Sequence, residues 1–429
     1  MVQFALRLTA PETVTAAEAA SSFYWLLDSR SSFTPGLGPS LGAFGAVPSL
    51  NIDLVRIALA VYAADRSVPR TAGGSDWNQR EIELQIPVSD AAPWRRVASE
   101  LEAAINFLSG DRWRLSFHEE EAPTEDVRQH PETPRRVVLL SGGADSAVGG
   151  LVSRSALKAG DHQHLLSHFS ASHLAPTQRR VAAELERLIP GPSQRHEVVH
   201  LSRKGRRIDG NAYPDEFSTR SRSLLFLSLG LAAAAVHGVP LWIPENGFAS
   251  LNPPLGPERR GSLSTRTTHP MFLQSLTAVL NQIGAHAQVE NPFARSTKGE
   301  IFAQAANLVG AAEASALLSG THSCSLTGQR AHGVPPSKSC GVCFACLVRR
   351  ASFVASGLDD QTEYIDADDN TALAEWLTTN SVERQVQNFI QRGVQPRDLI
   401  ALNLPADYPI SEALDLCRRA IVELRSLYP

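Results

Sequence analysis

The chain has 429 residues, 43% of them hydrophobic and 20% charged, which predicts a globular protein of two or three domains rather than one modest core. With 40 basic and 44 acidic residues its net charge is -4, so there is no overall basic footprint for a nucleic-acid partner. We therefore expect small molecules or proteins as partners.

The first 130 residues predict an α+β domain. Glu81–Ile86 alternates like a half-buried strand that stops at Pro87, Trp94–Leu108 has helical periodicity, and Trp113–Phe117 alternates again. This part contains no catalytic constellation, which is typical of a structural or partner-docking module. His118–Pro134 follows with six acidic residues and three prolines, and it predicts a linker or surface loop.

A strand, a glycine-rich turn and a helix are predicted next. Val137–Leu140 is typical of a buried parallel strand, and Ala147–Leu157 is rich in small residues and predicts a helix. Two glycines between them would let the backbone approach a phosphate at the helix N-terminus. The alternative is an ordinary strand-to-helix turn. The residues expected to bind the phosphate are Ser141, Gly142, Gly143, Ala144, Asp145 and Ser146.

The same turn indicates which class of nucleotide site is present. A Walker P-loop is excluded because no lysine follows Gly143. The hexapeptide instead resembles the S-G-G-x-D-S signature of the PP-loop ATP pyrophosphatases, which cleave ATP between its α and β phosphates. Asp145 would cap the helix or hold Mg²⁺.

One apolar run is long enough to suggest a membrane span. Leu224–Trp242 is interrupted at Ser228, His237, Gly238 and Pro240, so it predicts a buried helix followed by a strand at Leu241–Ile243. No secretory signal pattern opens the sequence, and we expect a cytoplasmic protein that contacts no membrane.

Four of the five cysteines cluster near residue 340. C-G-V-C-F-A-C contains two overlapping C-x2-C steps, a spacing that suits tetrahedral Zn²⁺, and four thiolates leave no open metal position for catalysis. An iron–sulfur cluster and two disulfides are the alternatives. Cys417 lies in an amphipathic helical pattern and is predicted to be a buried small hydrophobe. The predicted zinc ligands are Cys324, Cys340, Cys343 and Cys346.

The chain beyond the cysteines predicts a helical tail. Asp359–Asp369 is acidic, and helical patterns follow at Thr371–Leu377, Ser381–Arg392 and Ser411–Leu427. We thus expect three domains, covering residues 1–130, 131–355 and 356–429.

The order of these motifs resembles the QueC family, the 7-cyano-7-deazaguanine synthases. S-G-G-A-D-S precedes C-x15-C-G-x-C-x-x-C-L-x-R, in which Leu347 and Arg349 close the motif. Ser221–Ser228 resembles the family's Arg-Asn-x-x-Phe-Leu-Ser helix start, with Ser223 in place of asparagine. Arg295–Ile301 resembles its Ser-Lys-x-Glu-Ile block, in which the lysine faces the nucleotide phosphates. The resemblance covers about residues 134–355.

Three departures qualify the resemblance. The gap from Cys324 to Cys340 is longer than usual, and Thr177–Arg180 only echoes the family's Tyr-Gly-Gln-Arg-His segment. Its Asp-Tyr-Ser-Gly-Tyr-Pro substrate loop is replaced by Pro244–Pro270. With these departures and its N-terminal extension, the chain more closely resembles the QueC-like proteins of bacterial antiviral operons, the QatC type and its counterpart in type IV CBASS.

The resemblance implies an α/β fold with a parallel-sheet PP-loop core of the adenine nucleotide α-hydrolase type. It also implies a ligase-like ATP pyrophosphatase that uses ATP with Mg²⁺ to adenylate the carboxylate of 7-carboxy-7-deazaguanine. Asp145, Lys298 and Arg222 are the expected catalytic residues, and Thr297 joins Lys298 and Arg222 in ATP binding. The alternative for the lysine and the arginine is a solvated surface position.

Substrate specificity is expected in Glu245–Pro270, because this segment replaces the family's substrate loop. Glu245 would accept the two donors of a guanine-like edge, and Asn246 would pair with its carbonyl. Arg266 would clamp the substrate carboxylate, and His269 would act as base for the incoming amine. The alternative for each is a hydrogen bond that braces the loop.

We expect the incoming amine to be the N-terminus of a partner protein, giving an amide. An extra N-terminal domain has no obvious use when ammonia is the nucleophile, and a free α-amine is partly deprotonated at neutral pH. The alternatives are an ammonia-using 7-cyano-7-deazaguanine synthase, a PP-loop tRNA-modifying enzyme and a nucleotide-sensing scaffold. The resemblance leaves open whether the chain forms a homodimer.

Overall fold

The computed structural model describes residues 2–70, 79–169, 174–216, 219–253, 266–324, 335, 338–365 and 371–428. The chain forms two compact units. Unit 1 comprises Met1–Val137, Val199–Leu241 and Gly261–Glu290, and unit 2 comprises Val138–Val198, Trp242–Arg260 and Asn291–Pro429. The boundaries predicted at residues 130 and 355 do not coincide with this division, because middle segments of the chain belong to unit 1 and the C-terminal helices to unit 2.

Unit 1 contains a parallel sheet in the order β2-β1-β3-β4. Its strands are β1 (Val2–Arg7), β2 (Ser22–Tyr24), β3 (Glu81–Val88) and β4 (Arg112–Glu119), and helices α1 (Ala16–Ser21), α2 (Ser49–Ser67), α3 (Ala91–Arg96) and α4 (Ala98–Ser109) connect them. Helical crossovers are the usual connection between parallel strands. The part expected to be α+β is therefore a parallel α/β layer.

The predicted strands of unit 1 are present, but β3 runs through Pro87 to Val88 instead of stopping before the proline. The register between β1 and β3 ends at Ala5 opposite Gln85. Pro87 thus lies beyond the part of β3 that is paired on both sides, where a missing N–H is tolerated. The helix expected over Trp94–Leu108 is divided at its fourth residue into α3 and α4.

The outer edge of β4 is closed by side chains from α3 and α4. The backbone N–H of Trp113 donates to Asn106 at 2.8 Å, and that of Leu115 donates to Glu102 at 2.7 Å. Arg95 donates to the carbonyl oxygen of Phe117 at 2.9 Å. Three of the backbone groups that an edge strand usually exposes are therefore already bonded.

The acidic segment after β4, predicted as a linker or surface loop, is bonded to the rest of unit 1. The Glu125 carboxylate accepts hydrogen bonds from the backbone N–H groups of Ser40 (2.5 Å) and Gly42 (3.2 Å), and Arg128 N–H donates to the Gly42 carbonyl at 2.9 Å. A Cβ added to Gly42 would lie 2.5 Å from the carbonyl oxygen of Asp126, so this close approach requires glycine.

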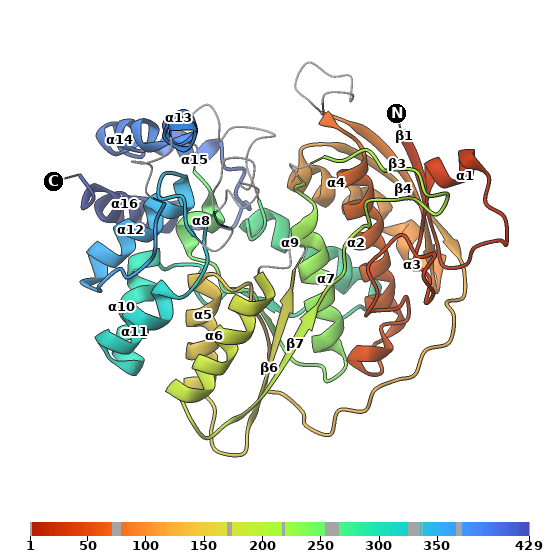
Figure 1. The fold of residues 1–429 in the computed structure, drawn as a ribbon, viewed down its shortest axis with the longest axis horizontal. Helices are drawn as coiled ribbons and strands as arrows, with labels where there is room; N and C mark the ends of the chain where they lie inside the picture. The colour runs from red at the N-terminus through yellow and green to blue at the C-terminus, as the bar shows by residue number, and fades with distance from the viewer. Residues whose placement is uncertain are drawn as a thin grey trace. The chain divides into compact units, whose positions relative to one another are not determined.

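Helices from the N-terminal and middle parts of the chain pack together in unit 1. Helix α2 is buried along most of its length and lies beside α7 (Arg222–Ala235), as Figure 1 shows. Helix α4 packs against α9 (Pro270–Ile283). The extension is thus built into the same core as α7 and α9.

A buried ionic network joins the C-terminal end of α2 to the start of α7. The Asp65 carboxylate accepts hydrogen bonds from the N–H groups of Arg220 (2.8 Å) and Ser221 (2.9 Å) and from the Ser221 hydroxyl (2.6 Å). Arg80 pairs with both Asp65 and Asp111. The fully buried members are Asp65, Arg80, Asp111 and Ser221, and Arg70 pairs with Asp111 at 2.8 Å.

The second sheet has the strand order β7-β6-β5-β8-β9. Its strands are β5 (Val137–Leu139), β6 (His162–His168), β7 (Ser193–Val199), β8 (Leu241–Trp242) and β9 (Val289–Glu290). The order reverses between β5 and β8, which is the topological switch point of an open α/β sheet. The predicted α/β class with parallel sheets is confirmed.

Helices complete the core of unit 2. They are α5 (Ala144–Ser155), α6 (Leu174–Leu188), α8 (Gly247–Leu251), α10 (Lys298–Val309), α11 (Ala311–Ser319) and α12 (Phe344–Ser356). Helices α5, α6, α10, α11 and α12 contribute to one apolar cluster with β5 and β6. The predicted strand at Val137–Leu140 is confirmed, and the helix after the turn begins at Ala144, three residues earlier than expected.

The predicted helical tail is confirmed as part of unit 2. It contains α13 (Thr371–Asn380), α14 (Glu383–Arg392), α15 (Pro396–Ile400) and α16 (Ile410–Arg425). Helices α14 to α16 share an apolar cluster with α8 and α12, in which Cys417 is fully buried as predicted. Helix α15 was not predicted, because five residues are too few to show helical periodicity.

The apolar run from Leu224 to Trp242 forms most of α7 and then β8, as predicted. Across the described part of the chain, no helix is both long and apolar enough to cross a membrane.

Candidate active site and metal centre

The glycine-rich turn connects β5 to α5. Gly142 has a φ of +86°, a left-handed conformation that favours glycine, and Gly143 is the residue before the first helical residue. The Ser141 hydroxyl accepts a hydrogen bond from Gly143 N–H at 3.2 Å and lies 3.0 Å from the Ser146 hydroxyl. Ser141 is exposed and Gly143 is half-buried, so an anion has access to this side of the turn.

A second segment, which sequence reasoning missed, holds the turn from outside. His322 N–H donates to the Gly142 carbonyl at 2.9 Å, and Ala144 N–H donates to the Ser323 hydroxyl at 3.4 Å. Gln178 donates to the carbonyl oxygen of Ser141 at 3.3 Å. The sequence did contain a signal for both residues. Gln178 lies in the segment that resembles a family motif only weakly, and Ser323 directly precedes the first cysteine of the cluster.

Asp145 is the centre of a buried polar cluster. Its carboxylate accepts hydrogen bonds from the Asn246 side chain at 2.7 Å and from Asn246 N–H at 3.1 Å, and it pairs with the Lys298 ammonium. Burial opposes ionisation, but Lys298 and these hydrogen bonds outweigh it and hold the pKa of Asp145 below its usual value. Three segments that are distant in sequence thus meet at one carboxylate.

The fold explains why these segments meet. Asp145 follows β5 and Asn246 follows β8, and these strands are neighbours in the sheet. Parallel sheets bind ligands at the carboxyl ends of the strands beside the point where the order reverses. The cluster therefore lies where this class of sheet places its ligand site.

Glu245 belongs to the same cluster. Its N–H donates to the Asn291 side chain at 3.3 Å, and Asn291 donates back to the Glu245 carbonyl at 2.8 Å. Burial, followed by the charge of Asp145, raises the pKa of Glu245 to about 8. The carboxyl is thus mainly protonated at neutral pH, whereas its predicted contact with a guanine-like edge requires the ionised form.

Lys298 is the first residue of α10, and Thr297 is its N-cap. The Thr297 hydroxyl accepts from Glu300 N–H at 3.3 Å in a capping box and donates to Glu423 of α16. Gly299 N–H donates to Glu423 at 3.0 Å. Glu423 was not anticipated, and it already binds the hydroxyl of Thr297, a residue predicted to bind ATP.

The other predicted site residues lie in unit 1. Arg222 begins α7, and its guanidinium lies 5.2 Å from the centre of the Phe226 ring. The Arg222 side chain is exposed to solvent. Because Arg222 and the turn belong to different units, its contact with ATP stays a prediction.

Arg266 and His269 come together on Phe107 of α4. The Arg266 guanidinium lies 4.3 Å from the ring centre and donates to the Phe107 carbonyl at 2.8 Å. The His269 ring lies 5.1 Å from the Phe107 ring, and its Nδ1 accepts from Met271 N–H at the start of α9. Both side chains therefore have a structural contact, and their substrate roles stay predictions. Residues 254–265 of the predicted substrate segment lie outside the described residues.

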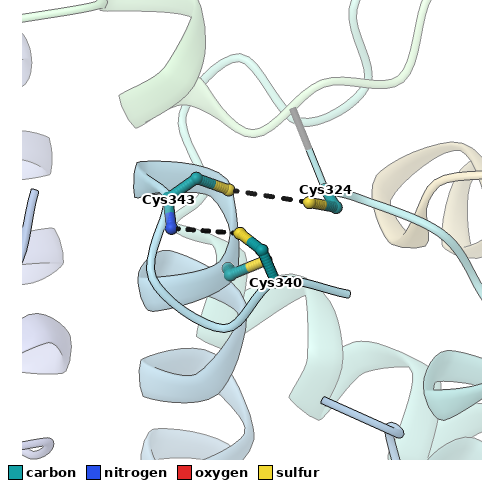
Figure 2. A group of neighbouring side chains, drawn as sticks. Cys324, Cys340 and Cys343 are labelled. Atoms are coloured by element: carbon teal, nitrogen blue, oxygen red, sulfur yellow. Dashed lines mark hydrogen bonds between the residues drawn. The ribbon is translucent and has the colours of Figure 1, made fainter. Parts of the chain in front are cut away.

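The four clustered cysteines converge from two segments, and Figure 2 shows the sulfurs of Cys324, Cys340 and Cys343 facing one another. Cys324 and Cys343 Sγ are 4.0 Å apart, and Cys340 and Cys346 Sγ are 3.8 Å apart. A disulfide needs about 2.05 Å, so two disulfides are excluded in this arrangement. Thiolates around Zn²⁺ at about 2.3 Å have sulfurs roughly 3.8 Å apart, so the four residues fit a tetrahedral metal site.

Local structure accounts for this arrangement. Gly341 has a φ of +76°, which lets the chain turn between the first two cysteines of the C-x2-C step. Cys343 is the residue before α12, and Cys346 lies in its first turn. Leu373 and Leu377 of α13 cover the cluster.

The cysteine cluster is connected to the glycine-rich turn through Arg349. This buried residue of α12 donates to the hydroxyls of Thr321 (2.8 Å), Thr362 (2.9 Å) and Ser323 (3.4 Å). Ser323 in turn accepts from the turn at Ala144. The Leu-x-Arg ending of the cysteine motif therefore has a structural function that links the two motifs.

Comparison with known proteins decides the family. The chain is 30% identical over 252 residues to a 7-cyano-7-deazaguanine synthase of Cupriavidus necator, and the match covers 98% of that protein and 54% of this chain. The chain belongs to the 7-cyano-7-deazaguanine synthase family. Synthases of Ralstonia nicotianae (30% over 250 residues) and Novosphingobium aromaticivorans (28% over 256 residues) match 98% and 96% of their lengths and 54% of this chain.

Membership in the 7-cyano-7-deazaguanine synthase family confirms the predicted resemblance to QueC and the prediction of a ligase-like ATP pyrophosphatase. About half of the chain lies outside the match to these synthases. No family model matches the chain.

Proposed function

We propose that this chain adenylates the carboxylate of a 7-deazaguanine acid and transfers the acyl group to the N-terminal amine of a partner protein, in a cytoplasmic antiviral system. A carboxylate oxygen attacks the α-phosphorus of ATP, and pyrophosphate leaves. The amine nitrogen then attacks the acyl carbon, AMP leaves, and an amide forms with loss of one proton. Both steps are typical of ligases that form AMP.

The glycine-rich turn and the Asp145 cluster are the proposed ATP site. The exposed side of the turn suits the phosphates, and Lys298 carries the positive charge that would stabilise pyrophosphate as it leaves. Mg²⁺ bound with ATP would supply further charge, and Asp145 is the residue proposed to hold it. In the structure Lys298 occupies one oxygen of Asp145, so nucleotide binding is expected to move the ammonium from the carboxylate to the phosphates.

The proposal of a protein acceptor depends on one observation. About half of the chain lies outside the match to the synthases, and the N-terminal extension packs through Phe107 onto Arg266 and His269, the residues proposed to bind the acid and accept the proton. Additional protein surface beside the residues that bind the acid is expected when the nucleophile is larger than ammonia.

The decisive experiment compares acceptors. The full-length protein is incubated with ATP, Mg²⁺ and 7-carboxy-7-deazaguanine, together with ammonium or with proteins encoded beside it whose N-termini are either free or acetylated. We expect pyrophosphate release and an added acyl mass only on a protein with a free N-terminus. Formation of 7-cyano-7-deazaguanine from ammonium as the main product would refute the protein acceptor.

Such a refutation would favour a second function, an ammonia-using 7-cyano-7-deazaguanine synthase. The observation that supports it is the name shared by the matched relatives. Phe107→Leu distinguishes the two proposed functions, because it alters the side chain through which the N-terminal extension contacts Arg266 and His269. For a protein acceptor, the variant should lose conjugation while ATP cleavage persists.

Zinc is the metal proposed for the four cysteines, in a structural role. The sulfur spacing fits Zn²⁺, and four protein ligands leave no position for substrate. Elemental analysis should find about one zinc per chain. Cys343→Ser should lose both zinc and stability, because binding free energy of the metal is folding free energy. Iron in place of zinc would contradict this assignment.

A further inference from the structure

Helix α16 closes the space beside two residues that hold Asp145. A Cβ added to Gly247, the first residue of α8, would lie 2.6 Å from the Leu416 side chain. Asn246 and Lys298 line a cavity of about 10 Å³ together with Ala420 and Glu423 of α16. A cavity of this size holds at most one water molecule. The tail therefore forms a packed wall next to the proposed ATP site.

Glu423 bonds to the first turn of α10 on both sides of Lys298. Its carboxylate accepts hydrogen bonds from the Thr297 hydroxyl and from Gly299 N–H, at 3.0 Å for the latter. A Cβ on Gly299 would lie 2.5 Å from Glu423 Oε1, so glycine is required for this contact. A carboxylate is also favoured at a helix N-terminus by the helix dipole.

A second residue of α16 strengthens the same contact. Arg419, one helical turn before Glu423, pairs with Glu300 and donates to the carbonyl oxygen of Arg295 at 3.0 Å. Bonds from two neighbouring turns of α16 thus restrict both the rotation of α10 and the position of its first residue. That residue is Lys298, whose ammonium reaches Asp145.

We propose that Glu423 is a positioning residue, which fixes the first turn of α10 so that Lys298 is held at Asp145 and aimed at the phosphates. The inference rests on the proposed roles of Asp145 and Lys298 in ATP cleavage. It assigns the C-terminal helix a function in the reaction, although α16 supplies no group that touches the reacting atoms.

The test uses two variants that disturb the contact in different ways and one matched control. Glu423→Gln keeps the size of the side chain but replaces one acceptor by a donor. Gly299→Ala leaves Glu423 intact and displaces it sterically, although alanine in a helix is otherwise stabilising. Glu313→Gln is the control, because Glu313 lies on α11 in an exposed pair with Arg187 and has no part in this contact.

Two readouts are measured in the full-length protein. Without ATP, the acylation rate of the Lys298 amine, followed by peptide mass spectrometry with an amine-acylating reagent, should rise in both variants. In pyrophosphate release, kcat should fall roughly 10- to 100-fold with a smaller change in KM for ATP, because charge stabilisation in the transition state depends on the position of Lys298. The control should match the wild type in both.

The outcomes separate the inference from the proposed function. If Lys298 acylation and kcat in both variants equal those of the control, Glu423 does not position Lys298. If acylation rises as expected but the wild type releases no pyrophosphate with the acid, the positioning of Lys298 is supported and the proposed function fails.

Discussion

Each unit of the molecule buries a cluster of carboxylates and basic side chains, but the two clusters differ in charge balance. In unit 1, Asp65 receives donors from the start of α7 and from Arg80, and Asp111 is paired with Arg80 and Arg70. In unit 2, the carboxyls of Asp145 and Glu245 lie with the Lys298 cation, and the pKa of Glu245 is raised to about 8.

We interpret the cluster of unit 1 as structural and that of unit 2 as part of the proposed active site. Buried acids whose partners are all in place hold elements together, as Asp65 holds α2 to α7. A cluster in which one acid stays protonated can exchange protons or cations, and strongly shifted pKa values are typical of active sites. We therefore expect substitutions in the first cluster to lower stability and substitutions in the second to lower activity.

The largest effect is expected from Asp65→Ala. This change leaves Arg80 buried beside a single acid and removes three hydrogen bonds from the start of α7. Removing one partner of a buried ion pair typically lowers the free energy of unfolding by about 3–5 kcal/mol. Urea unfolding measures this loss of free energy of unfolding. Asp28→Ala, which removes an exposed pair with Arg30, is the control. A loss below about 1 kcal/mol would show that the network does not hold the unit together.

Asp145→Asn should lower activity strongly and stability only slightly. We expect pyrophosphate release to fall by at least about 100-fold, because the residue that holds Lys298 and the proposed Mg²⁺ is neutralised. Stability should fall less than in Asp65→Ala, since Glu245 can ionise and take over the pairing with Lys298 once the charge of Asp145 is gone. Normal turnover would exclude Asp145 from the reaction.

The smallest effect is expected from Glu245→Gln, and it depends on pH. A carboxyl whose pKa is about 8 in the folded state and near 4.5 when unfolded stabilises the protein fully below pH 4.5 and loses that contribution as pH rises towards 8. The glutamine variant has no such proton. Its free energy of unfolding relative to the wild type should therefore rise between pH 6 and pH 7, by up to about 1.4 kcal/mol.

This titration is read from urea unfolding of both proteins without nucleotide or Mg²⁺. A difference that is independent of pH would show that Glu245 ionises normally, and the contrast between the two clusters would then disappear.

Sequence alone could predict the features whose residues are close together. The C-x2-C steps place three cysteines within one short segment, and the hexapeptide determines the turn between β5 and α5. The contacts of Asp145 were not predictable in the same way. Asn246 was assigned to the substrate and Lys298 to ATP, but their shared bond to Asp145 depends on strand order, which the sequence does not display.

The contacts of the N-terminal extension were also not predictable from the sequence. An acidic, proline-containing segment predicted a domain border near residue 130, and a separate domain before it could be deleted without loss of ATP cleavage. In the structure α2 buries a face of α7, and Asp65 bonds to the residues before it. Such a deletion would expose an apolar helix, so single substitutions are the sounder tests.

The closed edge of β4 limits how any partner can bind unit 1. An extended peptide that joined the sheet there would first have to displace Asn106, Glu102 and Arg95 from Trp113, Leu115 and Phe117. The same holds for a second copy of the chain that approaches strand to strand. Loss of these three bonds opposes growth of the sheet at β4, so we expect a partner protein or a second protomer to recognise side chains on the surface of the unit rather than its backbone at that edge.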